Sequence, residues 1–385
     1  MSLNYGLSSD TWCDKEIEAI NRVVKSNRYT MGKEVKEFER QFAEMMGVKH
    51  AVMTNSGSSA NLIMLATLRQ QHTDPQRNEI IVPAVSWSTT FFPVHQLGYT
   101  LKFVDIDLET MQMDPMKVAA SINSKTAAIF TVNLLGSASD LTSLKFLAEE
   151  NNIPLLEDNC ESFGAKLKGK QCGTFGEMGT FSFFFSHHLQ TMEGGMVVTN
   201  DDTKVDYLRS LRAHGWIRDM EFDTFQKSDD ELMNSFHFVT PGYCVRPLEF
   251  SGAVGQVQLT KWEGMLEQRR ANALVAQKAF GKNPNVILQK EIGESSWFGF
   301  GLILINNLQN KRKEVIDVLQ SNGVECRPIV AGNFTKNPVI NQLNHYPLGT
   351  YDKADYLHDN GFFIGNDCVD LTSKIEAVAK LIEEL

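Results

Sequence analysis

The sequence predicts an α/β protein built on a large, mostly parallel sheet flanked by helices, with a smaller α/β unit at its C-terminal end. Short apolar runs alternate with helical patterns through the first half of the chain, which is the rhythm of βαβ units. Some of these runs, such as Ile153–Leu156, are apolar at consecutive positions, as expected for strands that are covered on both faces. The length of 385 residues is sufficient for two domains.

Apolar residues at helical spacing, among them Phe38, Phe42 and Met46, predict helices over residues 13–27 and 33–47. Further on, seven apolar runs predict the strands of the large sheet, with helices over residues 60–69 and 141–150 between them. The predicted strands are His50–Thr54, Glu79–Val85, Leu101–Val104, Ala127–Leu135, Ile153–Glu157, Gly179–Phe185 and Met196–Thr199.

Residues 214–243 are polar, dotted with aromatic side chains and without clear periodicity, so we predict a long surface loop there. A long helical pattern resumes from Leu248 to about Ala279. It leads into a C-terminal unit with a predicted strand at Gly301–Ile305 and helices over residues 311–322 and 371–384. We therefore predict a large domain over residues 1–250 and a small domain over residues 251–385.

The chain carries 37 Lys and Arg against 47 Asp and Glu, a formal net charge of −10, which argues against nucleic acid or an anionic membrane surface as a partner. It shows no apolar run long enough to span a bilayer and no secretory leader, so we expect a cytoplasmic protein. The cysteines are scattered without C-x-C or C-x-x-C pairs, which predicts reduced thiols and no metal or iron–sulfur site. They are Cys13, Cys160, Cys172, Cys244, Cys326 and Cys368.

Two segments that follow predicted strands carry groups suited to ligand binding. Gly57, Ser58 and Ser59 open a helix, where small residues let a phosphate approach the free N–H groups and hydroxyls add donors. A plain helix N-cap would use the same residue types. Asp158 closes a buried strand at its carboxyl end, the usual place for a ligand contact, and Glu161 can face the same cavity. Either acid can instead cap the next helix.

Aromatic, hydroxyl and imidazole side chains follow two other strands. Trp87 can stack on a planar ring, although tryptophan at such a place is more often part of the core. Ser182 and Ser186 are both even-numbered, which predicts that they share one face of the Phe-rich strand. His187 follows at the end of that strand, where its position favours a catalytic role, whereas we expect a structural role for His188.

Taken in order, these motifs resemble the DegT/DnrJ/EryC1 family of sugar aminotransferases and dehydratases, which are pyridoxal-phosphate enzymes of fold type I. The resemblance covers nearly the whole chain and extends to the segment Gly242–Pro247. Each motif alone is weak, but the ordered set is specific. The resemblance implies an aminotransferase-like fold, pyridoxal 5'-phosphate or pyridoxamine 5'-phosphate as cofactor, and a homodimer with its site at the subunit interface.

The resemblance also implies roles for individual residues. Asp158 pairs with the pyridine nitrogen and keeps the ring an electron sink, while Trp87 stacks on the ring. The turn formed by Gly57, Ser58 and Ser59, together with Ser182, holds the phosphate. Two positions depart from the family pattern: Glu161, assigned to the cofactor, stands where many members have glutamine, and Cys244 stands where aminotransferases often have an asparagine.

The position of the family's Schiff-base lysine falls on His187, and the sequence has no lysine between Lys170 and Lys204. A lysine binds the cofactor covalently and moves protons, whereas a histidine can only move protons. Freely held pyridoxamine phosphate is therefore implied. A histidine at this position resembles the 3-dehydratase branch of the family, and the segments Phe181–His188 and Cys326–Pro328 look like the members that act on GDP-4-keto-6-deoxymannose.

That branch implies removal of the C3 hydroxyl of a nucleotide-diphosphate 4-keto-6-deoxyhexose, giving GDP-4-keto-3,6-dideoxymannose in a colitose pathway of O-antigen lipopolysaccharide, with L-glutamate as amino donor. His187 suits both proton transfers, because the ordinary pKa of histidine is about 6.5. The guanine base and the sugar's stereochemistry rest on resemblance alone. Arg218, Arg246 and Arg327 are candidates for the diphosphate, since guanidinium groups bind phosphate bidentately, and each can equally be a surface arginine.

Three alternatives stay open. A CDP-sugar 3-dehydratase also uses histidine but carries an iron–sulfur cluster, which the cysteine spacing disfavours. A nucleotide-sugar aminotransferase of the perosamine type turns over through the missing lysine. A non-catalytic protein that binds the cofactor or a nucleotide sugar would also lose the lysine, but Asp158, Trp87 and the phosphate turn are all retained.

Overall fold

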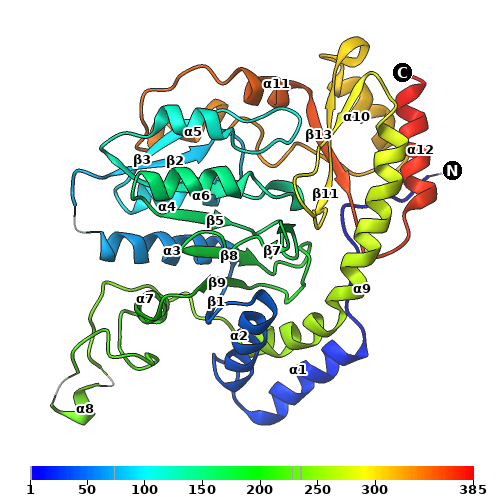
Figure 1. Ribbon diagram of the computed structural model, residues 1–385. Coiled ribbons are helices and arrows are strands. Elements are labelled where there is room, and N and C mark those ends of the chain that lie inside the picture. Colours follow the sequence, from blue (N-terminus) through cyan, green and yellow to red (C-terminus); the bar gives the residue numbers. More distant parts are fainter. Residues whose placement is uncertain (1, 73, 228, 235) are drawn as a thin grey trace.

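The computed structural model describes residues 2–72, 74–227, 229–234 and 236–385, and it has the expected α/β architecture (Figure 1). Within this part of the chain, seven strands form the large sheet in the order β1-β9-β8-β5-β4-β2-β3. β9 runs antiparallel to both of its neighbours and every other pair in the sheet is parallel, which confirms the mostly parallel sheet. The strands are β1 (His50–Thr54), β2 (Glu79–Pro83), β3 (Thr100–Val104), β4 (Thr126–Val132), β5 (Leu155–Asp158), β8 (Met178–Ser182) and β9 (Gly195–Thr199).

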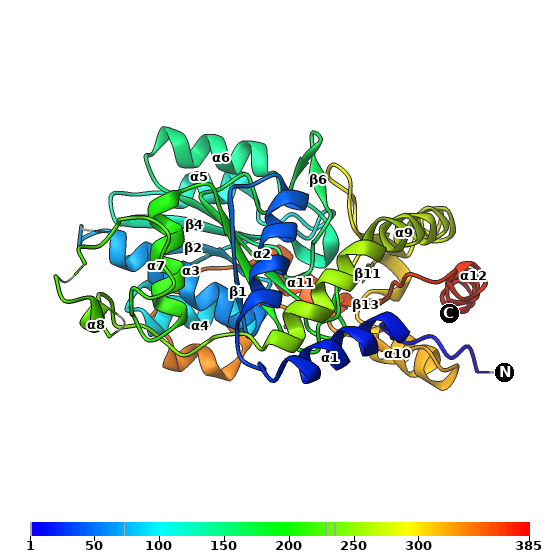
Figure 2. The same cartoon turned by 90° about the horizontal axis from the view of Figure 1, so that it is seen from below.

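Helices cover both faces of this sheet, as Figure 2 shows, with α5 and α6 on one face and α3, α4 and α7 on the other. Every residue of the central strands β2 and β4 is buried, because neither face meets water. The covering helices are α3 (Gly57–Gln71), α4 (Ser88–Gln96), α5 (Pro115–Ser121), α6 (Leu141–Glu150) and α7 (Asp202–Arg212). A short hairpin of β6 (Lys166–Leu167) and β7 (Lys170–Gln171) lies beyond β5 along the chain.

One long helix, α9 (Glu249–Phe280), links the large sheet to the C-terminal unit (Figure 1). Its first half packs on α1 (Asp14–Ser26) and α2 (Lys33–Met46). Only glycine fits at Gly255 in this contact, because an added Cβ would lie 2.6 Å from the ring of Phe38. Its second half contributes Phe280 to the core of the C-terminal unit.

The C-terminal unit is an antiparallel sheet in the order β10-β11-β13-β12, flanked by α10 and α12. Tyr5, near the other end of the chain, packs in the same core and donates a hydrogen bond to Gly365 O over 2.8 Å. Phe334 instead packs on Phe91 of the large domain, with ring centroids 4.4 Å apart. The boundary near residue 250 stays a prediction. The elements are β10 (Val286–Leu288), β11 (Gly299–Leu304), α10 (Arg312–Ser321), β12 (Cys326–Arg327), α11 (Asp352–Asn360), β13 (Gly361–Gly365) and α12 (Thr372–Glu383).

Three strands end earlier than the sequence predicts. β2 ends at Pro83, β4 at Val132 and β8 at Ser182, although the apolar runs continue for two or three residues. Most of the continuing residues, such as Leu135 and Phe183, are buried outside the strands, whereas Phe184 and Phe185 are 37% and 59% exposed. An apolar run therefore does not distinguish a strand from the irregular segment that follows it.

Among the described residues, four α-helices outside the segment 214–243 were not predicted. α4 contains Pro93, which is unusual inside a helix, and α5 and α11 are too short to show a clear period. In α7 the few apolar residues stand in a mostly polar sequence. The predicted loop at 214–243 contains one short helix, α8 (Glu231–Asn234), among its described residues. In the described ranges we find no helix with the length and apolar character needed to cross a membrane.

Candidate active site

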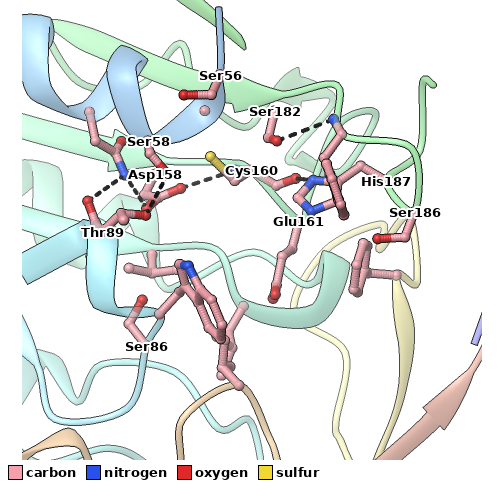
Figure 3. A pocket seen from close by; sticks show the side chains of 18 of the residues that line it. Ser56, Ser58, Ser86, Thr89, Asp158, Cys160, Glu161, Ser182, Ser186 and His187 are labelled. Atoms are coloured by element: carbon pink, nitrogen blue, oxygen red, sulfur yellow. Dashed lines mark hydrogen bonds between the residues drawn. The ribbon is translucent and has the colours of Figure 1, made fainter. Parts of the chain in front are cut away.

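A cavity of about 580 Å³ lies where the carboxyl ends of β5 and β8 meet the start of α3 and the C-terminal unit (Figure 3). Most of the predicted site residues line this cavity, while Ser59, Arg218 and Arg246 do not. No lysine is among the described residues that line it. The predicted residues that do line it are Gly57, Ser58, Trp87, Asp158, Glu161, Ser182, Ser186, His187 and Arg327.

Asp158, at the end of β5, is held by three donors. The Asn61 amide and the Thr90 hydroxyl donate to Oδ2 over 2.8 and 2.9 Å, and the Cys160 N–H donates to Oδ1 over 3.1 Å. The Asn61 amide is itself oriented, because its oxygen accepts a 2.6 Å hydrogen bond from Thr180. The carboxylate is therefore fixed in place, and its remaining lone pair can accept a hydrogen bond from a group in the cavity.

The start of α3 forms the cradle predicted for a phosphate. Ser56 caps the helix by accepting from the Ser59 N–H over 3.1 Å, and its hydroxyl donates to that of Ser59 over 3.0 Å, so the Ser59 hydroxyl is bonded to the cap and does not line the cavity. The amides of Gly57 and Ser58 begin the helix and have no intrahelical acceptor. A Cβ at Gly57 would lie 2.6 Å from Cβ of Ser182, so only glycine lets α3 and β8 approach this closely. Free N–H groups and the hydroxyls of Ser58 and Ser182 meet at this point.

His187 lies in the turns that follow β8, with its Nδ1 2.7 Å from the carbonyl oxygen of Cys160 (Figure 3). A carbonyl can only accept, so Nδ1 carries the proton and Nε2 keeps its lone pair. Burial lowers the pKa of His187 to about 4, against the opposing effects of the Cys160 carbonyl and the Asp158 carboxylate. His187 is therefore a neutral base at pH 7.

Ser186 also lies in these turns and not on the strand, because β8 ends at Ser182. The prediction that both serines share one strand face is wrong, since the period-two alternation stops where the strand stops. His188 is buried and does not line the cavity: it packs edge-on against Trp262 and Phe298, and its Nε2 lies 3.4 Å from Ser296 O.

Glu161 faces the cavity from the turn after β5 and accepts a hydrogen bond from the Leu135 N–H over 3.0 Å. Burial, together with the negative charge of Asp158, raises the pKa of Glu161 to about 7, although the Leu135 amide opposes the shift. At neutral pH this carboxyl is therefore protonated about half of the time. The cavity thus holds a neutral base and a carboxyl group that can carry a proton.

Trp87 immediately precedes α4 and is 56% exposed, so it is not a core residue. Arg327 reaches the cavity from β12, with Nη2 3.2 Å from the carboxylate of Glu325. Arg218 and Arg246 instead flank the ring of Trp216, at 4.0 and 5.7 Å from its centroid.

Sequence reasoning missed several contributors. Asn61 follows Gly57 by one helical turn and Thr90 follows Trp87 by three residues, so helical spacing carried a signal for both. The backbone carbonyl of Cys160 and the ring of Phe298 carried none, because a carbonyl has no side-chain signature and Phe298 is distant in sequence.

The chain is similar to known proteins along almost its whole length. The profile of the DegT/DnrJ/EryC1/StrS aminotransferase family matches residues 11–378. GDP-4-keto-6-deoxy-D-mannose 3-dehydratase of Yersinia pseudotuberculosis is 47% identical over 388 aligned residues, which cover 99% of each chain. A crystal structure of GDP-4-keto-6-deoxymannose-3-dehydratase with a trapped PLP-glutamate geminal diamine has a TM-score of 0.94 and 46% identity, covering 98% of this chain and 100% of the other.

A second solved structure is a variant of ColD, a GDP-4-keto-6-deoxymannose-3-dehydratase, in which a histidine is changed to lysine and the serine directly before it to asparagine. It is 45% identical, with a TM-score of 0.93, and covers 97% of this chain and 100% of its own. In the present sequence a serine directly precedes a histidine only once, at Ser186 and His187.

Proposed function

The chain belongs to the DegT/DnrJ/EryC1/StrS aminotransferase family, and from this premise we propose that it is a nucleotide-sugar 3-dehydratase that depends on pyridoxamine phosphate. Its substrate is GDP-4-keto-6-deoxymannose, and the product is GDP-4-keto-3,6-dideoxymannose. The observation that carries the proposal is a cavity lined by His187, the phosphate cradle and Asp158, with no lysine among the described residues of its lining. Relatives of nearly equal length that are named for this reaction support it.

The choice between the two adjacent histidines follows from two independent observations. The serine–histidine pair altered in the ColD variant corresponds to Ser186 and His187 here. In this chain His187 lines the cavity, whereas His188 is buried behind it. His187 is therefore the proposed acid–base residue.

The residues of the cavity fit pyridoxamine phosphate. The amides at the start of α3, with the hydroxyls of Ser58 and Ser182, would hold its phosphate. Asp158 has a remaining acceptor position for a ring N–H, and Trp87 is exposed at the cavity as a stacking surface. When bound, the cofactor supplies an amino group and an electron sink that allow a hydroxyl next to the sugar carbonyl to leave.

The protein itself contributes proton transfer to the reaction, through His187. His187 accepts a proton at Nε2, because its Nδ1 proton is held by the Cys160 carbonyl. Once charged, it donates that proton toward the departing 3-hydroxyl. Across the whole reaction the sugar exchanges a C–OH for a C–H, and the two electrons come from glutamate, which leaves as 2-oxoglutarate and ammonia.

We also propose a homodimer that shares its sites between subunits. Arg218 and Arg246 lie outside the cavity of their own subunit, beside an exposed aromatic segment that includes Phe236 and Phe238. Such a surface suits a second copy of the chain. Native mass spectrometry measures this directly, and a monomer with full activity would contradict it.

We further propose that the protein works in the cytoplasm. All six cysteines are free, and two of them, Cys13 and Cys244, are exposed. Such thiols suit a reducing compartment. Cell fractionation tests this proposal, and recovery of the native protein from an extracellular or periplasmic fraction would contradict it.

The mass of the product tests the proposed reaction. The purified protein is incubated with pyridoxal phosphate, glutamate and GDP-4-keto-6-deoxymannose. A sugar nucleotide lighter by one oxygen, formed together with 2-oxoglutarate, is the expected result. An amine in place of the ketone would mean aminotransfer, and an unchanged substrate with bound cofactor would contradict the assignment.

A further inference from the structure

Two turns that are distant in the sequence interlock beside His187. One follows β4 and contains Leu135 and Gly136, and the other precedes β11 and contains residues 295–298. The Phe298 N–H donates to Leu135 O over 3.0 Å, and the Ser296 N–H donates to Gly136 O over 2.8 Å. A Cβ at Gly136 would lie 2.5 Å from the backbone nitrogen of Phe298, so only glycine allows the two turns to close.

The backbone of the two turns is strained, and a buried arginine binds its carbonyl groups. Leu135 and Trp297 have φ of 54° and 50°, a left-handed conformation that is unfavourable for a bulky residue and persists only where its surroundings impose it. The buried guanidinium of Arg269, on α9, donates from Nη1 to the carbonyls of Trp297 and Asn366 over 3.3 and 3.0 Å. These contacts fix the backbone that carries Phe298.

The side chain that this backbone presents is the ring of Phe298, which is half-buried and lines the cavity. Its centroid lies 5.2 Å from that of His187 at an interplanar angle of 75°, and 5.6 Å from that of His188 at 60°. We infer that Phe298 is a positioning residue, which keeps the imidazole of His187 in the orientation set by the Cys160 carbonyl and keeps water from its ring. This inference rests on the proposed role of His187.

Several ionisable groups surround His187. Asp158, Glu161 and Cys160 come from the end of β5 and the turn after it, Arg269 from α9 and His188 from the next position along the chain. Two further charged residues, Arg327 and Glu193, line the same cavity. Burial is the largest cause of the lowered pKa of His187, so loss of the ring that covers it should raise that pKa toward 6.5.

NMR titration of the cofactor-free protein, labelled in its histidine side chains, tests this directly. The His187 signal is identified by its absence in His187→Asn. In Phe298→Ala we expect its pKa to rise by roughly one unit, and in the milder Phe298→Leu by less. The matched control is Phe300→Leu, because Phe300 lies in the C-terminal core and has ring contact with Trp297. It should lower the melting temperature and leave the pKa of His187 unchanged.

An unchanged pKa of His187 in folded Phe298→Ala would overturn the inference. The acidic limb of the pH dependence of kcat/KM, measured for the dehydration, should move up by the same amount as the NMR value. A wild-type protein without dehydratase activity would refute the proposed function and leave the NMR result intact, so the two failures are distinguishable.

Discussion

The cavity has two walls of opposite character. The sheet wall, formed by Asp158, the start of α3 and Ser182, is polar, and its carboxylate accepts three hydrogen bonds from the protein. The C-terminal wall, formed by Phe298, Pro328, Val330 and Phe363, is apolar, with Arg327 as its cation. His187 lies where they meet, hydrogen-bonded to the turn after β5 and packed on Phe298. The difference indicates that one wall holds the reacting groups while the other excludes water.

The largest expected effect comes from the residue between the walls. His187→Asn should lower the rate of dehydration by about 10³-fold, because it removes the proposed acid–base group. Cofactor binding should persist, since the phosphate cradle and Asp158 are untouched. Steady-state rates and the visible absorbance of bound pyridoxal phosphate measure the two properties separately.

His188→Asn is the matched control for this change. His188 is buried outside the cavity, so its replacement should cost about 1–2 kcal/mol of stability and change the rate by only a few-fold. If His188→Asn abolished the rate and His187→Asn spared it, the assignment of the two histidines would be reversed.

The main residues of the sheet wall could be predicted from the sequence, whereas on the C-terminal wall only Arg327 was predicted and the apolar residues were not. Asp158 and Gly57 follow buried strands, and the carboxyl ends of parallel strands meet at one edge, so local patterns were sufficient. Phe298 reaches the cavity through contacts with Leu135, across 163 positions of sequence, that leave no local pattern. The predicted strands also extended past the ends of β4 and β8, because the residues that follow are apolar although they lie outside the sheet.

Asp158→Asn probes the sheet wall alone. The amide loses the negative charge that would pair with a ring N–H, and its NH2 group meets the donors of Asn61 and Thr90. We expect the rate to fall by about 10²-fold or more, with weaker retention of the cofactor on dialysis. Asp158→Glu keeps the charge but displaces it, so an equal loss in both variants would show that position matters more than charge.

Arg327→Ala probes the C-terminal wall. If Arg327 binds the diphosphate, as the sequence predicts, loss of the guanidinium should raise the KM for the nucleotide sugar by about tenfold, with a smaller effect on kcat. Arg327→Lys should restore part of the loss. Arg246→Ala is the comparison. A similar rise in KM in this variant would mean that Arg246 of one subunit contributes to the site of the other. An unchanged KM would show that Arg246 does not contact the substrate.

The smallest expected effect is a change in the pH dependence of stability when Glu161, on the sheet wall, is replaced. Glu161 has a folded pKa of about 7, above the ordinary value of 4.5, so its contribution to stability is complete below pH 4.5 and is lost as the pH rises through 7. Glu161→Gln stays neutral at every pH. In the cofactor-free protein, its stability relative to wild type should therefore grow from pH 5 to pH 8, by at most roughly 1.4 kcal/mol per pH unit.

Urea unfolding at several pH values measures this difference in free energy. The control is Glu193→Gln, which removes an exposed carboxylate from the same cavity and should follow the wild-type pH dependence closely. A difference between Glu161→Gln and wild type that stays constant with pH would show that Glu161 is ionised throughout. The sheet wall would then hold two negative charges beside His187. Glu161 could not donate a proton in the reaction.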